Sequence, residues 1–176
     1  MLRFAPLLLA LALTAPLAPA DAKPRVRANP QIDYAGFVRL TTDVESYRRE
    51  RLVDWAGFAA AARERGALIL DARSADAFAA GHIEGAVNLP FTDFTAQSLK
   101  RVIGRADRPV LIYCNNNFSN NEAPVQLKSV RLALNIQTFV NLVGYGYRNV
   151  RELDDVVDFN DPKVGWVKST ALASNR

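Results

Sequence analysis

The sequence has 176 residues and a formal net charge of +4, with 49% hydrophobic and 23% charged residues. This composition is typical of one globular domain with a full core and excludes a disordered chain. Basic residues are interspersed with acidic ones, which argues against a nucleic-acid-binding surface. With one cysteine and one histidine, the chain has no partner for an internal disulfide and shows no metal-ligand spacing. We therefore expect no metal and no cofactor.

Residues 1–22 have the features of a secretory signal peptide. Arg3 gives a positive start, residues 4–17 are almost wholly apolar, and the small residues of 18–20 and 20–22 fit a cleavage site. The apolar run is short for a membrane span, although an uncleaved anchor remains the alternative. We expect an exported protein, in the bacterial periplasm, with no stable membrane insertion after cleavage.

The rest of the chain divides into three parts. We expect residues 23–40 to form a linker followed by an extended N-terminal strap, because apolar residues gather between 32 and 40. Residues 41–168 are expected to form the domain, and residues 169–176 a frayed C-terminus.

Within the domain, short helices alternate with short apolar strands. Capping residues such as Asp54 and Ser74 mark helix starts, and glycines mark helix ends. The predicted helices lie at residues 44–51, 55–65, 74–80, 96–103 and 122–134. The predicted strands lie at residues 68–70, 86–89, 110–113 and 138–142. Residues 164–167 either add a last strand or pack on the strap around Phe37. This alternation predicts an α/β fold with a central parallel sheet flanked by short helices.

The single cysteine, Cys114, lies between the apolar run 110–113 and the polar run 115–121. The helix predicted from residue 122 would direct unpaired backbone N–H groups and a positive dipole end toward it. Such groups stabilise a thiolate, the reactive form of cysteine. We predict that Cys114 is a nucleophile with a lowered pKa; an inert buried thiol is the alternative.

Other candidate site residues surround Cys114 in the sequence or end a neighbouring strand. The polar run predicts an anion-binding loop, with a merely solvated loop as the alternative; its residues are Asn115, Asn116, Asn117, Phe118, Ser119 and Asn120. Asp71 and Arg73 follow a strand, where ligands bind in parallel sheets, but a pair that ties loops together is favoured. For His82 we favour a structural hydrogen bond in a turn over a general-base role.

Three segments of the sequence, 68–73, 81–90 and 110–114, resemble the rhodanese domain in order and spacing across residues 52–153. The resemblance implies an α/β fold with a central parallel sheet. It also implies that Cys114 carries sulfur as a persulfide, wrapped by backbone N–H groups of the loop 115–120, and that His82 is structural.

The loop departs from the pattern of the family it resembles. Many active rhodaneses have arginine or lysine there to hold thiosulfate, whereas residues 115–120 carry no charge. Related phosphatases end a longer loop with arginine, where this chain has Asn120, so a phosphate-binding fork is missing. We expect weak activity with thiosulfate. A small sulfur donor such as a persulfidated thiol, or a protein partner, is the favoured donor.

A second departure is found in segment 144–147, where Tyr145 and Tyr147 replace the more usual glycine pair. These tyrosines either line the pocket mouth or fill the core. Together with Phe118 they suggest an alternative function, in which the domain is a binding module with an incidental thiol. A redox sensor that forms mixed disulfides through Cys114 is a third, weaker alternative.

Overall fold

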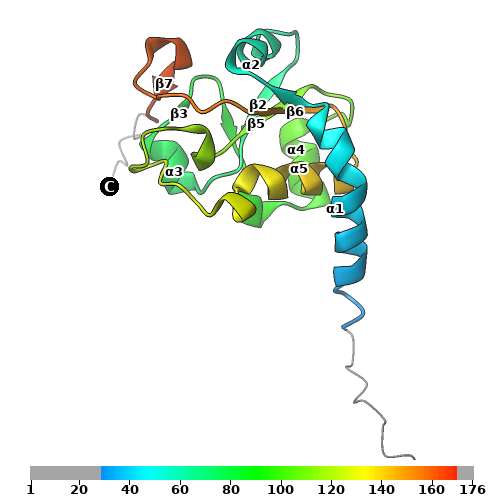
Figure 1. Ribbon diagram of the computed structural model, residues 1–176. Coiled ribbons are helices and arrows are strands. Elements are labelled where there is room, and N and C mark those ends of the chain that lie inside the picture. Colours follow the sequence, from blue (N-terminus) through cyan, green and yellow to red (C-terminus); the bar gives the residue numbers. More distant parts are fainter. Residues whose placement is uncertain (1–28, 170–176) are drawn as a thin grey trace, which may run out of the picture. The chain divides into compact units, whose positions relative to one another are not determined.

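The computed structural model describes residues 29–169 (Figure 1). Residues 34–169 belong to one compact unit, whereas residues 29–33 belong to another and contain a turn closed by the Ile32 N–H and the Asn29 carbonyl at 3.0 Å. The predicted signal peptide, and the predicted linker up to residue 28, lie outside the described residues, as do residues 170–176. Within 29–169, every helix is too short or too polar to cross a membrane.

The centre of the domain is a five-stranded sheet in the order β1-β6-β5-β2-β4. All four neighbouring pairs are parallel. The strands are β1 (Leu52–Val53), β2 (Leu68–Asp71), β4 (Val87–Asn88), β5 (Val110–Tyr113) and β6 (Val150–Leu153). The predicted α/β architecture is therefore confirmed, and the carboxyl ends of β2 and β5 lie side by side.

Helices cover both faces of this sheet (Figure 1). One face packs against α1 (Tyr34–Arg49), α4 (Ala96–Ile103) and α5 (Leu134–Gly144), and the other against α2 (Trp55–Ala62). Alternate residues of β5 point to opposite faces, so Val110 and Ile112 enter the first core and Leu111 and Tyr113 the second. This double burial explains the apolar sequence of the central strands.

Capping residues begin the helices where the sequence predicts. The Asp54 carboxylate accepts the Gly57 N–H at 2.7 Å before α2. The Ser74 hydroxyl accepts the Ala77 N–H at 3.3 Å before α3 (Ala75–Ala80). A reciprocal capping box joins Thr95 and Ser98 at the start of α4. These starts could be predicted because a cap depends only on residues close in sequence.

The N-terminal part of the domain differs from the prediction. The extended strap is wrong over residues 34–40, and the short helix predicted at 44–51 is part of the longer helix α1. Leu40, Val44 and Tyr47 recur at helical spacing and pack against the core that contains α5. This apolar stripe makes the segment helical although its outer face is heavily charged.

The segment after Cys114 also differs. The predicted helix at 122–134 and the predicted strand at 138–142 are both wrong, because the helix here is α5, Leu134–Gly144. Residues 122–133 instead form turns and a short 3-10 helix, in which Leu127, Val130 and Leu132 are exposed. A short apolar run such as 138–142 fits a buried helix as well as a strand. Strand β6 was not predicted.

A small second sheet completes the fold. It pairs β3 (His82–Ile83) with β7 (Trp166–Val167) in antiparallel orientation. Strand β7 lies within residues 164–167, for which a last strand was one of two alternatives, whereas β3 was not predicted. The Trp166 ring lies directly against Gly81, where a Cβ atom would be 2.3 Å from its Nε1. Only glycine therefore fits at this end of α3.

Candidate functional site

Cys114 directly follows β5 at the carboxyl edge of the sheet, where ligands bind in open parallel α/β folds. Its neighbour along this edge is the end of β2, because Asp71 pairs with Tyr113. The residue is only 1% exposed, so the thiol is enclosed by the protein.

Three backbone N–H groups, those of Asn135, Asn116 and Leu134, act on the Cys114 thiol and favour its ionised form. Leu134 and Asn135 are the first residues of α5, and no side chain caps this helix. Its free N-terminal N–H groups and its positive dipole end therefore face the sulfur. The predicted helix terminus beside Cys114 is present, but α5 supplies it instead of a helix at residue 122.

The acidity of Cys114 differs from the prediction. Burial raises the pKa of the Cys114 thiol above its ordinary value, and the three N–H groups only partly oppose this effect. The negative charge of Glu152 raises it further. The predicted lowering of the pKa is therefore wrong, because loss of hydration outweighs the hydrogen bonds.

The loop after Cys114 offers fewer donors to the sulfur than expected. Residues Asn115–Asn117 form a 3-10 turn. The backbone N–H groups of Asn117, Phe118 and Ser119 donate to the carbonyls of Cys114, Asn115 and Val157 instead, at 2.9 to 3.2 Å. Within the loop, the Asn116 N–H acts on the thiol, and the Asn117 N–H also faces it in the capping box that Cys114 and Asn117 form.

The loop's asparagine side chains mainly hold neighbouring segments in place. Asn115 Nδ2 donates to the Gln126 carbonyl at 2.8 Å. Asn116 pairs in both directions with the backbone of Lys128, at 2.9 and 3.2 Å. Asn120 Nδ2 donates to the Asp158 carboxylate at 2.7 Å. These amides are tied to the protein, so they are neither a solvated loop nor a ring of free donors.

Asn117 has the largest share of these contacts. Its Oδ1 accepts from the Cys114 backbone N–H and from Asn135 Nδ2, each at 2.9 Å. Its Nδ2 donates to the carbonyls of Leu153 and Asp155 at 2.8 and 3.1 Å. This buried side chain joins β5, β6 and α5 around the cysteine.

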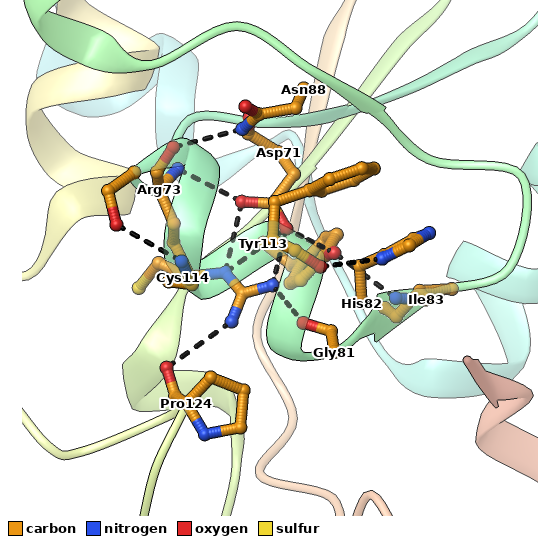
Figure 2. Close-up of polar contacts among 12 residues, drawn as sticks. Asp71, Arg73, Gly81, His82, Ile83, Asn88, Tyr113, Cys114 and Pro124 are labelled. Carbon is orange, nitrogen blue, oxygen red and sulfur yellow. Dashed lines mark hydrogen bonds and ion pairs between the residues drawn. The ribbon is translucent and has the colours of Figure 1, made fainter. Parts of the chain in front are cut away.

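Asp71 and Arg73 form the buried ion pair favoured from the sequence (Figure 2). Arg73 Nη2 contacts Asp71 Oδ2 at 2.5 Å and donates to the Gly81 carbonyl at 2.7 Å. Tyr113 donates its hydroxyl to Asp71 Oδ2 at 2.5 Å and accepts the Ile83 N–H at 3.2 Å. Burial raises the pKa of Tyr113 well above its ordinary value. The cluster fixes the ends of β2 and β5 and the start of β3.

His82 has a structural contact. Its Nδ1 lies 2.8 Å from the Phe78 carbonyl, and its ring stacks on the Phe78 ring with centroids 3.7 Å apart. Figure 2 shows the ring on the far side of Tyr113 from the Cys114 sulfur. This matches the hydrogen bond predicted in the turn.

The aromatic residues suggested for partner binding do not form one surface. Phe118 is fully buried against Tyr113 and Trp166, and Tyr147 is buried in the core that contains α5. Of the three, only Tyr145 is exposed. The suggested surface of Phe118, Tyr145 and Tyr147 is therefore wrong, because two of its members fill the core.

Glu152 is a site residue that was not predicted from the sequence. It pairs with Ile112 across β5 and β6, so it shares a sheet face with Ile112 and with Cys114 two residues further on. Arg48 of α1 binds its carboxylate through two nitrogens, with Nε at 2.6 Å from Oε2. Burial raises the pKa of Glu152, and Arg48 opposes this rise. A glutamate within the otherwise mostly apolar run 150–153 would have indicated a buried charge, had that run been predicted as a strand.

A cavity of about 440 Å³ opens at the carboxyl ends of β2 and β4, and Cys114 is not among its lining residues. We call it the β2–β4 cavity. Its lining residues are Ala72, Arg73, Ser74, Ala75, Pro90, Phe91, Thr92, Asp93 and Leu134. The N–H of Leu134 also acts on the Cys114 thiol, so the cavity wall and the thiol share a residue.

The site belongs to the class of parallel α/β proteins that place a single cysteine directly after a central strand, facing the N-terminus of a helix. Residues 56–155 match the family model described as the Rhodanese-like domain, and the chain belongs to this family. The curated proteins contain no match to the sequence.

Several solved structures are similar to the chain. The rhodanese-like domain of the Alr3790 protein from Anabaena sp. is 18% identical, with 58% of this chain and 93% of that chain covered and a TM-score of 0.43. The BH2092 protein from Bacillus halodurans is 20% identical, with 63% and 74% covered and a TM-score of 0.40. Wild-type EanB is 21% identical, with 64% and 25% covered and a TM-score of 0.44.

Proposed function

We propose that the protein is a sulfurtransferase in which Cys114 carries sulfane sulfur as a persulfide. The observation that supports this most directly is the set of backbone N–H groups of Asn116, Leu134 and Asn135 at the Cys114 sulfur. Donors fixed in advance stabilise an anion without reorganisation during the reaction. They would serve both the attacking thiolate and the persulfide that it forms.

The reaction proceeds in two displacements. The Cys114 thiolate attacks the outer sulfur of a donor persulfide R–S–SH, the S–S bond of the donor breaks, and R–S⁻ leaves. Cys114 then carries the S–SH group. An acceptor thiolate or cyanide attacks the outer sulfur, the new S–S bond breaks, and the Cys114 thiolate is regenerated.

The preferred donor is a persulfidated thiol or a protein, rather than thiosulfate. The loop 115–120 contains no cation. The nearby guanidinium of Arg73 is already bound by the Asp71 carboxylate. A doubly charged anion would therefore enter this site without a balancing charge.

We also propose that the protein acts after export to the periplasm. The support is the sequence of residues 1–22, which fits a signal peptide with a small-residue cleavage site. N-terminal sequencing of protein recovered from the periplasmic fraction tests this, and an intact N-terminus in the cytoplasmic fraction contradicts it.

Mass spectrometry tests the sulfur-transfer proposal. The protein, purified without reductant and incubated with glutathione persulfide, should gain the mass of one sulfur atom on Cys114 and lose it with dithiothreitol. Cys114→Ser should gain none. Thiosulfate:cyanide turnover should be slow, and rapid turnover that survives Cys114→Ser contradicts the proposal.

The enclosure of the thiol favours a second candidate, a rhodanese-like binding module with an unreactive cysteine. Cys114 is 1% exposed, and burial raises the pKa of its thiol. In this case the thiol should stay unmodified after incubation with the donor, although it reacts once the protein is unfolded. The same mass measurement therefore separates the two functions.

A further inference from the structure

The β2–β4 cavity is placed to admit a reactant to Cys114. Strand β2 pairs with β5 through Asp71 and Tyr113, so the next residues, Ala72 and Cys114, continue along the same edge. Ala72 and Leu134 both line the cavity, and the N–H of Leu134 acts on the thiol. Cys114 does not itself line the cavity, so Ala72 and Leu134 are the wall residues that connect the cavity to the thiol.

The cavity wall has an uneven charge. Its two ionisable residues are Arg73 and Asp93. The Arg73 guanidinium is bound by Asp71 and by the carbonyls of Gly81 and Pro124, so its charge is balanced within the protein (Figure 2). Within residues 29–169, the Asp93 carboxylate accepts a hydrogen bond from the Thr92 hydroxyl at 3.3 Å and takes part in no ion pair. Once the charge of Arg73 is balanced by Asp71 behind the wall, Asp93 leaves one uncompensated negative charge in the wall.

The remainder of the wall is apolar or hydroxylic. Phe91, Pro90 and Leu134 supply apolar surface, and Ser74 and Thr92 supply hydroxyls. Such a wall suits a small molecule with a short hydrocarbon part and a positive charge near Asp93. An anion would meet the Asp93 carboxylate with no opposing free cation in the wall.

We propose that the β2–β4 cavity binds the sulfur donor or acceptor of Cys114, and that this reactant is a small aminothiol or its persulfide, with a positively charged amino group facing Asp93. The proposal rests on the sulfur-transfer function and adds the substrate class to it. The transfer step is unchanged: the Cys114 thiolate takes the outer sulfur of the aminothiol persulfide, and the aminothiol leaves as its thiolate.

Charge-matched thiol reagents test the cavity without requiring sulfur transfer. Aminoethyl and sulfonatoethyl methanethiosulfonate differ in the sign of their charge, and each forms a disulfide with a thiolate and releases methanesulfinate. Rates at Cys114 are divided by the rates of the same reagents with 2-mercaptoethanol. We expect the cationic reagent to be favoured by about tenfold.

Substitution of Asp93 links this preference to the cavity. Asp93→Asn should reduce the preference to near unity while leaving the rate of the uncharged methyl reagent unchanged. Asp107→Asn is the matched control. Asp107 comes just before the start of β5, whereas Cys114 follows its end, and Asp107 pairs with Arg105. It should retain the full preference.

Three results overturn the proposal: an equal or anionic preference, a cationic preference that survives Asp93→Asn, or a native protein that reacts with none of the reagents although the unfolded chain does.

Failure of this proposal can be distinguished from failure of the proposed function. If Cys114 is loaded by glutathione persulfide but shows no preference for the cationic reagent, the sulfur-transfer function stands and the aminothiol substrate is ruled out. If the cationic reagent is preferred but neither glutathione persulfide nor an aminothiol persulfide loads Cys114, the sulfur-transfer function is ruled out. The aminothiol is then ruled out as a substrate as well.

Discussion

Cys114 and Glu152 lie on the same face of the central sheet, on adjacent strands, so the thiol is buried beside a carboxylate. The charge of Glu152 opposes ionisation of the thiol, and the N–H groups at the start of α5 favour it. Arg48 reaches Glu152 from α1 and partly balances its charge. The reactivity of Cys114 therefore depends on a helix near the N-terminus as well as on its own loop.

Glu152→Gln should make Cys114 more acidic. The substitution removes a buried negative charge that raises the pKa of the thiol, and it keeps the shape of the side chain. The pH dependence of iodoacetamide alkylation, or of thiolate absorbance, should move to lower pH. Glu64→Gln is the control. Glu64 is also paired with an arginine, Arg151 of β6, but the Arg151 side chain lies on the face of the sheet opposite to Glu152. An unchanged profile in Glu152→Gln contradicts the role given to its charge.

The stability of the protein should carry a pH dependence from Glu152. Burial raises the pKa of Glu152 in the folded state above its unfolded value, so the folded state binds more protons between these two values. The stabilisation from Glu152 is therefore fully present when the pH is below the pKa of Glu152 in the unfolded chain. It is lost as the pH rises through the pKa of Glu152 in the folded protein. In urea unfolding from pH 4 to pH 8, the free energy of unfolding of wild type minus that of Glu152→Gln should fall as the pH rises, because protonated Glu152 resembles glutamine and ionised Glu152 does not. A signed difference that rises with pH contradicts this expectation.

Asn117→Ala should destabilise the domain by roughly 3 kcal/mol, because it leaves several buried backbone groups without partners. Asn117 accepts from Cys114 and Asn135 and donates to Leu153 and Asp155. Urea unfolding measures the loss. Asn120→Ala, which removes an exposed contact to Asp158 and a half-buried one from the Phe159 N–H, should cost clearly less. Equal losses would show that the burial of Asn117 is unimportant.

Arg73→Met should cost about 3–5 kcal/mol, because it leaves the Asp71 carboxylate buried and unpaired. Tyr113→Phe removes one hydrogen bond to the same carboxylate and should cost about 1–2 kcal/mol. Thermal and urea unfolding of both variants test this order. Arg105→Met, which breaks an exposed pair, should have no measurable effect. A reversed order for Arg73 and Tyr113 contradicts the assignment of the ion pair as the main contact.

The parts of the fold that could be predicted depend on neighbours in sequence. Strands β2 and β5 are short apolar runs with turn residues on both sides, and α2, α3 and α4 begin at capping residues. Helix α5 could not be predicted in this way. Its residues 138–142 form an apolar run that fits either a strand or a buried helix, and only packing against α1 and the sheet decides between them.

The sequence by itself determined that Cys114 directly follows a central strand at the ligand-binding edge of a parallel sheet, and that Asp71 and Arg73 form a pair near it. Both conclusions rest on short-range patterns. Only the tertiary structure decided which groups face the sulfur, because Asn135 and Glu152 come from distant parts of the chain. It also decided the acidity of the thiol, since burial is a property of the packed domain and here outweighs the helix terminus.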